Sequence, residues 1–513
     1  MIELLLIVPL LGTFLSILFP LKKVYTLPLW IATLHLFLTI INFIITCNPN
    51  LALIAEIFPG QLSGTQIQLV FFFKGYITFD GVSRVIILLT SFLFFSVSLY
   101  LYDYFKYSQI KNERSFIFFY LIFFFSMNVV ILADHLILFW SAIELSTLVT
   151  APLVLTFKTK KAVEATWRYI LLCSIGIAFA LIGVFFLVIS LNNPSGVIAE
   201  HLSILSISNL TFSRLYLVAN KLDVVWVKAS FILFLIGYGT KMGIAPMHTW
   251  LADTYSEAPT PVSALLAGAL TNCAYLGIYK SHQILIYANA GEFSSTLLKI
   301  YGLLSMFVAA IFILRQKDIK RMLGYSSMEN IGIVCVGTAI GGVAQYAALL
   351  QVIYHSLIKS SLFLSVGNII LLYKTKENHK IFELTKKMPK SFMLFFIGII
   401  GLIGLPPMGT FFSKMILIFE SFLQKDFLTM IFFLIFVIIV GCSLITHLIR
   451  ISFSKQEIDI GESRDNRESS ESKNVGEENF DSRFFVWPQY LLLISSIILT
   501  FWIPATLYNL IKH

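Results

Sequence analysis

The chain has 513 residues, of which 58% are hydrophobic and only 13% are charged, with a net charge of +9. A soluble domain of this length needs far more charge to cover its surface, so the composition excludes a soluble protein and indicates a membrane protein. The net charge does not indicate nucleic-acid binding, because the sequence has no basic patch with interleaved aromatic residues and because basic loops are usual beside anionic lipid headgroups.

Apolar stretches recur from end to end of the chain. Each has about 18 or more residues, enough to cross a hydrocarbon core of roughly 30 Å as a helix with its backbone hydrogen bonds satisfied. The sequence therefore predicts an all-α, polytopic membrane protein of about 14 transmembrane helices. The first segment lacks a basic start and a small-residue cleavage site, so we interpret it as a retained helix. The predicted spans are residues 1–20, 25–47, 77–101, 116–133, 136–155, 164–190, 226–247, 259–279, 300–314, 322–342, 345–373, 391–420, 426–449 and 485–511.

The distribution of Lys and Arg predicts the orientation of these spans, because cytoplasmic loops hold an excess of both. With the N-terminus outside, most of the 37 Lys and Arg fall in cytoplasmic loops, including those at 158–161, 315–321 and 374–390. An even number of spans then returns the C-terminus to the outside. We therefore expect a multi-pass protein of the cell inner (cytoplasmic) membrane with both termini outside.

Five cysteines lie far apart and mostly inside apolar runs: Cys47, Cys173, Cys273, Cys335 and Cys442. None forms a CxxC pair or lies near a His at metal-ligand spacing, so we interpret them as small buried hydrophobic residues. The sequence encodes no iron–sulfur motif, disulfide framework or nucleotide-binding glycine motif. We therefore expect no cofactor and no metal in this chain.

Two charged residues lie inside predicted spans of the first half. Glu144 lies in the span 136–155, which is otherwise almost free of charge, and Lys241 lies in the span 226–247. A charge at the bilayer centre costs at least about 2.5 kcal/mol, so each is a candidate functional residue. Desolvation favours the neutral form of each group and the opposite charge favours the ionised form, so the pair is suited to titration. A static salt bridge or a protonated carboxyl is the alternative for Glu144.

Glycine and proline interrupt two of the spans. Residues 243–246, Gly-Ile-Ala-Pro, follow Lys241, and residues 404–409, Gly-Leu-Pro-Pro-Met-Gly, precede Lys414. Such breaks free backbone groups that line polar cavities in transporters. Two interrupted spans, each with one buried Lys, predict two inverted five-helix repeats with one broken helix in each.

A third group of polar residues lies between the two breaks. His355 and Lys359 are four residues apart and so share one helix face, which suits a proton relay from Lys241 to Lys414. The alternative is that His355 is an ordinary hydrogen-bonding residue. Glu329, with Asn330, is expected to join the same polar seam.

Two further features are interpreted as structural. Asp80 and Arg84, also four residues apart, are predicted to neutralise each other near the start of a helix. Residues 457–481 are charged, rich in Ser and nearly free of aromatic residues, which predicts a disordered cytoplasmic linker or, as the alternative, a strap that docks a partner. The predicted organisation is N-terminal transmembrane helices at 1–101, a first repeat at 116–279, a second repeat at 300–450, the disordered cytoplasmic linker at 451–484, and a C-terminal transmembrane helix at 485–513.

Two motifs carry a resemblance to a known family. Residues 239–251, Gly-Thr-Lys-Met-Gly-Ile-Ala-Pro-Met-His-Thr-Trp-Leu, and residues 258–264, Ala-Pro-Thr-Pro-Val-Ser-Ala, resemble the proton-conducting membrane family. This family comprises complex I antiporter-like subunits, Mrp-type cation/proton antiporter subunits and the large membrane subunits of group 4 hydrogenases. The resemblance extends over residues 75–450, and within the family the chain is most similar to hydrogenase-4 component F.

The resemblance implies a role for each candidate residue. Glu144 and Lys241 would form the coupled pair of the first half-channel, Lys414 would be the exit group of the second, and His355 and Lys359 would bridge them. Asn272, Glu329 and His248 would support this path.

One departure from the family pattern lies on the helix after the first break. Many complex I members carry a central Lys or His there, whereas this chain has Ala267 and Asn272 at the two corresponding positions. Either Asn272 with water takes that role, or the relay is shifted toward Lys359.

The resemblance also implies a function: a proton-translocating subunit of a redox-driven complex, either hydrogenase-4-like or NADH:quinone oxidoreductase-like. The chain would be an oxidoreductase subunit without a redox centre, and its partners would be other membrane subunits, soluble redox subunits and the lipid bilayer. One alternative is an Mrp-type antiporter subunit, which the scarcity of acidic oxygen clusters disfavours. Another is an inert membrane anchor, which the costly buried charges disfavour. The electron donor and acceptor, and any transport of Na⁺, stay open.

Overall fold

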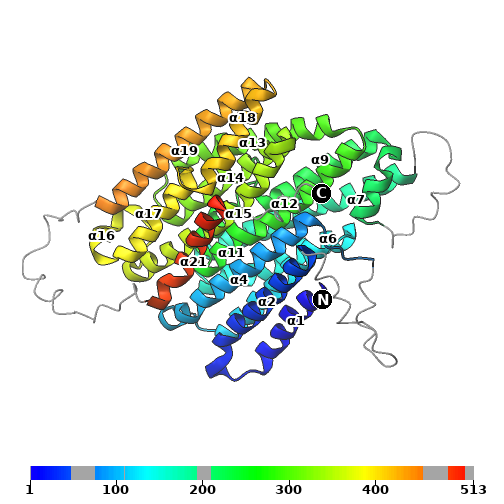
Figure 1. Cartoon of the computed structure of the whole chain (residues 1–513). Helices are drawn as coiled ribbons and strands as arrows, with labels where there is room; N and C mark the ends of the chain where they lie inside the picture. The colour runs from blue at the N-terminus through cyan, green and yellow to red at the C-terminus, as the bar shows by residue number, and fades with distance from the viewer. Residues whose placement is uncertain (1, 48–74, 109, 193–209, 454–482, 503–513) are drawn as a thin grey trace, which may run out of the picture.

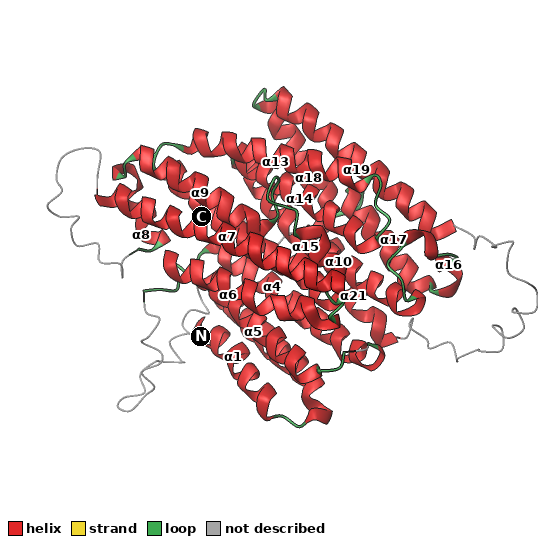
Figure 2. Ribbon diagram, turned by 180° about the vertical axis from the view of Figure 1, so that it is seen from behind, coloured by secondary structure: helices red, strands yellow, loops and turns green. Residues whose placement is uncertain are grey.

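The computed structural model describes residues 2–47, 75–108, 110–192, 210–453 and 483–502. Figure 2 shows this part of the chain as helices and loops, and its only β pairings are three isolated bridges. Ten of the helices in these ranges are long and apolar enough to cross a membrane. The predicted all-α, multi-pass architecture is therefore confirmed. The predicted linker at 457–481 and the end of the last predicted span lie outside the described residues.

The long helices run side by side through the molecule (Figure 1). Figure 1 places α1 and α2 at one edge of the bundle and α18 and α19 at the opposite edge, and Figure 2 shows α1 and α19 apart in the same way. The main helices are α1 (Ile2–Leu18), α2 (Leu27–Cys47), α4 (Gly81–Tyr107), α5 (Glu113–Leu132), α6 (Leu136–Val154), α7 (Lys160–Asn192), α9 (Val224–Met242), α12 (Thr271–Tyr287), α13 (Gly291–Ile313), α14 (Ile319–Ile340), α15 (Gly342–Tyr373), α17 (Pro389–Ile403), α18 (Gly409–Leu423), α19 (Phe427–Phe453) and α21 (Arg483–Phe501).

Several helices extend beyond the predicted spans. Helix α4 ends at Tyr107 instead of residue 101, and α13 begins at Gly291 instead of residue 300. The reason is that apolarity marks the part of a helix that lies in the hydrocarbon, whereas the polar turns at each end stay helical because their backbone bonds continue.

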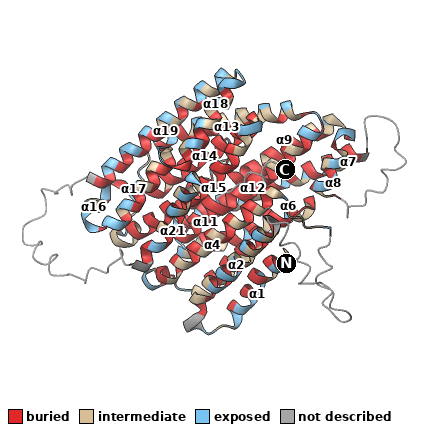
Figure 3. Ribbon diagram, in the orientation of Figure 1, coloured by how far each residue is buried: buried red, intermediate tan, exposed pale blue. Residues whose placement is uncertain are grey.

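Burial divides the helices into a central and a peripheral group (Figure 3). In the central segment Thr260–Tyr287, 94% of the residues in its most apolar 18-residue stretch are buried, compared with 39% in the same measure for α7, α13 and α19. The peripheral helices expose large apolar side chains such as Trp167, Ile175 and Phe179 on α7. A bilayer accommodates such faces, so the polar residues concentrate at the centre of the bundle.

The prediction that the cysteines are buried is confirmed for three of them. Cys173, Cys273 and Cys335 are buried, as predicted. Cys442 is exposed on α19, so its predicted burial is wrong, because α19 is a peripheral helix whose apolar residues face outward. The side chain of Cys47 lies outside the described part.

The first predicted helix break lies where the sequence places it. Helix α9 ends at Met242, and Gly243 follows in the left-handed region with φ of 93°. This conformation favours glycine, and a Cβ at Gly243 would also displace the terminal methyl of Leu251, the first residue of α10 (Leu251–Glu257), from which it would lie 2.2 Å away.

The second predicted break also lies in its predicted place. Helix α17 ends at Ile403, Gly404 follows with φ of 85°, and α18 begins at Gly409. A third irregularity was not predicted. Between α11 (Thr260–Leu265) and α12, residues Leu266–Leu270 form one π-helical turn.

The predicted pairing of Asp80 with Arg84 is wrong. Asp80 caps α4, accepting from the backbone N–H of Ser83 at 2.7 Å, and its other oxygen lies 3.0 Å from Nζ of Lys280 on α12. Arg84 instead donates to the carbonyl of Phe79 at 2.9 Å. The physical reason is that Lys280 is only 3% exposed, so its ammonium requires a carboxylate more than the partly exposed Arg84 does.

Replacing Asp80 by Asn is expected to lower the melting temperature of the detergent-solubilised protein at neutral pH. Burial opposes ionisation of Asp80, but the Lys280 ammonium and the hydrogen bonds from Ser83 outweigh it and lower the pKa of the carboxyl. A lowered pKa in the folded state stabilises the protein above the ordinary pKa of Asp, and this stabilisation is lost as the pH falls through the folded-state pKa. The difference between wild type and Asp80→Asn should therefore shrink in acid.

The matched control for this experiment is Asp223→Asn. Asp223 caps α9 by accepting from the N–H of Val225 at 2.8 Å, and Asn serves equally well as a cap. Equal destabilisation by the two substitutions would show that Asp80 acts as a cap and not as the partner of Lys280.

Candidate functional site

Lys241 is fully buried in the last turn of α9. Its Nζ donates to Oγ1 of Thr147 on α6 and to Oη of Tyr169 on α7, each at 2.7 Å. The ammonium also lies 4.8 Å from the centre of the Tyr169 ring. Two hydroxyls and an aromatic face therefore hold this charge without a carboxylate in direct contact.

Glu144 lies on α6, three residues before Thr147, and it is half-buried. One carboxylate oxygen accepts from Oγ of Ser174 on α7 at 2.6 Å, and the other is buried with no hydrogen-bond partner among the described residues. No ion pair joins Glu144 to Lys241 in this part of the chain. Both side chains bind hydroxyls of α7, Glu144 that of Ser174 and Lys241 that of Tyr169. The direct coupling of Glu144 with Lys241 stays a prediction.

Asn272 connects the first half of the bundle to the second. Its Nδ2 donates to the carbonyl of Gly268 at 2.6 Å and to Oγ of Ser356 on α15 at 2.9 Å. A Cβ at Gly268 would meet Oγ of Ser360 at 2.4 Å, so glycine allows this close approach of the π-helical turn to α15. Ala267 is buried in the same turn and offers no polar group.

His355 and Lys359 lie one turn apart on α15 and are both buried. The Nζ of Lys359 donates to Oγ of Ser326 on α14 at 2.5 Å. The Nε2 of His355 has no hydrogen-bond partner among the described residues. The two side chains therefore share a helix face as predicted, and the structure gives no direct bond between them.

Lys414 and Glu329 form a buried ion pair. The Nζ of Lys414 lies 3.5 Å from Oε1 of Glu329, and both side chains are nearly inaccessible. Lys414 also donates to the carbonyls of Ile403 at 3.0 Å and Leu402 at 3.3 Å. These carbonyls end α17, where the helix dipole carries partial negative charge, so the second break itself supplies part of the site.

A chain of amides and a hydroxyl lies beside this ion pair. Nε2 of Gln351 donates to Oδ1 of Asn330 at 2.5 Å, and Oγ of Ser413 donates to Oε1 of Gln351. The sequence analysis missed Gln351 and Ser413. Gln351 precedes His355 by four residues and so continues the same helix face, and this spacing was a signal that could have identified it.

Other contacts of the site left no signal in the sequence. Thr147, Tyr169 and Ser174 hold Lys241 and Glu144, but ordinary polar residues inside apolar spans are common. His248 lies between α9 and α10 beside the ring of Phe312, with centroids 6.4 Å apart, and no described contact brings it to the other candidates.

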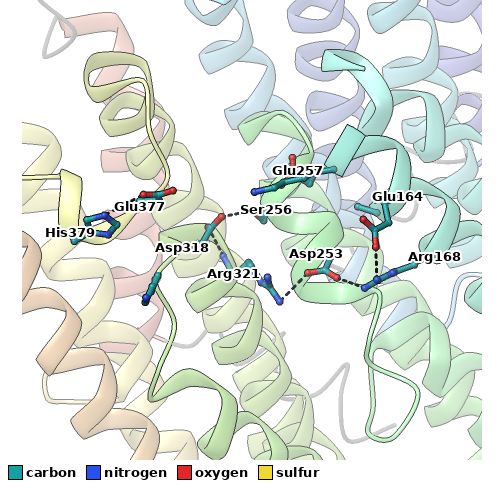
Figure 4. Close-up of a pocket in the computed structure, with 12 residues that line it drawn as sticks. Glu164, Arg168, Asp253, Ser256, Glu257, Asp318, Arg321, Glu377 and His379 are labelled. Atoms are coloured by element: carbon teal, nitrogen blue, oxygen red, sulfur yellow. Dashed lines mark hydrogen bonds and ion pairs between the residues drawn. The ribbon is translucent and has the colours of Figure 1, made fainter. Parts of the chain in front are cut away.

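A charged cavity of about 620 Å³ opens at the end of the bundle where α7 and α14 begin. In Figure 4, Arg168 of α7 points toward Asp253 of α10, and Arg321 of α14 reaches the same carboxylate; both contacts measure 3.1 Å. Tyr169, which holds Lys241, follows Arg168 in the chain and packs against Trp250 with centroids 4.9 Å apart. A residue that lines the charged cavity is thus next in the chain to one that holds Lys241.

Comparisons with known proteins identify the same family as the sequence motifs. The family described as "NADH:quinone oxidoreductase/Mrp antiporter, TM" matches residues 133–440. A hydrogenase-4 component F homolog of Methylacidiphilum infernorum (isolate V4) is 34% identical over 73% of this chain and 79% of its own length. Subunit N of the NADH-quinone oxidoreductase of Desulforudis audaxviator is 30% identical over 54% of this chain and 52% of its own. The resemblance drawn from the motifs is thus confirmed.

A solved structure has the same fold. It belongs to the membrane-bound sulfane sulfur reductase, described as an archaeal respiratory membrane complex, and the match has a TM-score of 0.78 at 18% identity. The alignment covers 100% of this chain and 96% of the other. At this identity the match supports the fold alone.

Replacing Glu329 by Gln is expected to lower the melting temperature of the solubilised protein, because it leaves the Lys414 ammonium buried without its carboxylate. Removing one partner of a buried pair costs roughly 3 kcal/mol. The double variant Glu329→Gln/Lys414→Met should recover part of this loss, because it removes both charges.

The control is Glu292→Gln, the same chemical change at an exposed position in the first turn of α13. It should leave the melting temperature unchanged. If the double variant were as unstable as the sum of the two single variants, Glu329 and Lys414 would not act as a pair.

Proposed function

Because the chain belongs to the NADH:quinone oxidoreductase/Mrp antiporter transmembrane family, we propose that it translocates protons across the membrane as one subunit of a redox-driven complex. The observation that supports this most is the row of buried lysines, Lys241, Lys359 and Lys414. Hydroxyls hold the first two, so neither is locked in its charged form by a carboxylate in contact. A group that carries protons must both accept and release one.

The proposed path begins at the charged cavity and at Glu144. It passes Lys241 and its hydroxyl partners, crosses from Asn272 to α15, continues along His355 and Lys359, and ends at the pair formed by Lys414 and Glu329. The described contacts leave gaps between Lys241 and Asn272 and between Lys359 and Lys414. Water molecules are proposed to fill them, as is usual in polar seams within membranes.

The proposed architecture is about 14 transmembrane helices with two inverted five-helix repeats. The first repeat consists of α5, α6, α7, the pair α9 and α10, and the continuous segment α11 to α12; the second consists of α13, α14, α15, the pair α17 and α18, and α19. In this division the broken helix is the fourth member of each repeat. The domain limits proposed from the sequence for these two repeats are 116–279 and 300–450.

The proposed complex is hydrogenase-4-like, on the strength of the 34% identity to a component F homolog. Other membrane subunits are proposed to pack against the apolar flanks, and soluble redox subunits to bind at the end that carries the charged cavity. An Mrp-type antiporter subunit is the second candidate, because the family description includes both classes. An inert membrane anchor is disfavoured by the number of buried charges.

Replacing Lys241 by Ala is expected to abolish proton pumping when the whole complex is reconstituted in vesicles. Lys241→Arg should also fail, since a guanidinium does not deprotonate in proteins and cannot release the carried proton. Pumping is measured as acidification or alkalinisation of the vesicle lumen, and the partner's redox centres are checked by spectroscopy.

Lys228→Arg is the matched control, because Lys228 lies in the opposite half of the same helix, α9, and its ammonium faces the ring of Phe293 at 5.4 Å. It should pump normally. If Lys241→Arg pumped at the wild-type rate, Lys241 would be a fixed charge, and the path would have to pass through Glu144, Asn272 and His355 without it.

We further propose that the protein lies in the cell inner (cytoplasmic) membrane with both termini outside. A cysteine placed at Lys380, in an otherwise cysteine-free variant, should react with a membrane-impermeant reagent only after the cells are opened. A cysteine at Lys425, which the α17 and α18 pair separates from Lys380, should react in intact cells. The reverse pattern would invert the proposed orientation.

A further inference from the structure

A second cavity, of about 800 Å³, lies beside the charged cavity at the same end of the bundle. It is bounded by the ends of α4 and α15 and by the starts of α7, α11 and α14. The two cavities share five lining residues, Lys161, Ser256, Glu257, Asp318 and Glu377, and Figure 4 labels the last four. Five lysines and three carboxylates line the second cavity, so its lining carries a net charge of +2.

The three carboxylates of the second cavity already have partners. Glu257 lies 2.8 Å from Nζ of Lys376, and Glu377 lies 2.8 Å from Nζ of Lys380. Asp318 accepts from Oγ of Ser256 at 2.6 Å and caps α14. Asp318 forms no ion pair among the described residues, so its charge and that of Glu257 partly offset the charge of Lys320. The five lysines still outnumber the three carboxylates.

Lys320 is the buried member of this group, with only 2% of the residue exposed. Its Nζ donates to the carbonyls of Ser256 at 3.1 Å and Ala258 at 2.5 Å, and no ion pair to it occurs among the described residues. Burial and the neighbouring Lys376 lower the pKa of Lys320 to about 7, and an anionic ligand in the cavity would favour its charged form. The charged form has three N–H donors, so one remains for that ligand. Lys160, Lys161 and Lys374 are exposed and likewise have no ion pair in the described ranges.

We propose that this cavity binds the phosphate of an anionic phospholipid headgroup. A buried ammonium with an unused donor and three exposed lysines supply the positive charge that a phosphodiester requires. The rest of the lining combines Ser and Thr hydroxyls with apolar side chains, among them Tyr104, Tyr107, Phe157, Ile370 and Leu371 near the ends of their helices. Tyrosine and lysine at helix ends are typical of the headgroup level of a bilayer, where a lipid presents its phosphate next to its glycerol and acyl chains.

None of the path lysines lines this cavity, although it shares residues with the charged cavity at which the proposed path begins. The proposed lipid site is tested by measuring lipid binding, without a transport assay. The reason is that an anionic headgroup neutralises surplus charge at the bundle end, which stabilises the folded protein whether or not it pumps.

The test uses the full-length chain in neutral detergent, titrated with phosphatidylglycerol or phosphatidylcholine and followed by native mass spectrometry. Phosphatidylglycerol should bind more tightly than phosphatidylcholine. Each of Lys160→Gln and Lys374→Gln should weaken phosphatidylglycerol binding about fivefold, the usual contribution of one lysine at a lipid headgroup. Lys320→Gln should weaken it further, with the melting temperature recorded to check folding; the two exposed positions carry the test if this variant does not fold.

The matched control is Lys386→Gln, since Lys386 is exposed in the same basic loop but lies outside the cavity lining. It should bind as the wild type does. A parallel titration with inorganic phosphate separates the two possible sources: failure to displace the lipid supports the headgroup, whereas displacement with the same dependence on Lys160 and Lys374 would overturn the lipid as the source. Equal binding of both lipids, or equal effects of Lys374→Gln and Lys386→Gln, would overturn the site altogether.

Discussion

The constraint on which the whole structure depends is the cost of placing an ammonium group where water is scarce. Lys241, Lys359 and Lys414 are each buried, and each is held in a different way. Two hydroxyls hold the first, one serine holds the second, and a carboxylate with two backbone carbonyls holds the third. The central helices therefore carry polar residues among their buried apolar side chains, and the peripheral helices expose further apolar side chains, as a bilayer allows.

The helix breaks provide free backbone groups beside the buried lysines. A continuous helix uses all its interior carbonyls, whereas an interrupted one leaves the last few without partners. At the second break, two of these carbonyls face Lys414, and Gly404 allows the turn that brings them there. At the first break, Lys241 itself lies in the last turn, so a helix end and a buried cation coincide in both halves of the bundle.

Several parts of this arrangement could be predicted from the sequence, because they depend on local rules. Gly and Pro at residues 243–246 and 404–409 marked both breaks, and the expense of an intramembrane charge marked Lys241, Lys359 and Lys414. The partners could not be predicted, because Thr147, Tyr169 and Ser326 are distant in the chain and chemically unremarkable. The pairing of Asp80 failed for the same reason: a neighbour at helical spacing was favoured over Lys280, which lies 200 residues away.

The position of α14 has a mechanical consequence. Ser326 and Glu329 are three residues apart on this helix, and they hold Lys359 of α15 and Lys414 of α18, respectively. One helix therefore provides the partners of both lysines, less than one turn apart. A rotation or axial slide of α14 would therefore change both contacts together, although no bond joins the two lysines.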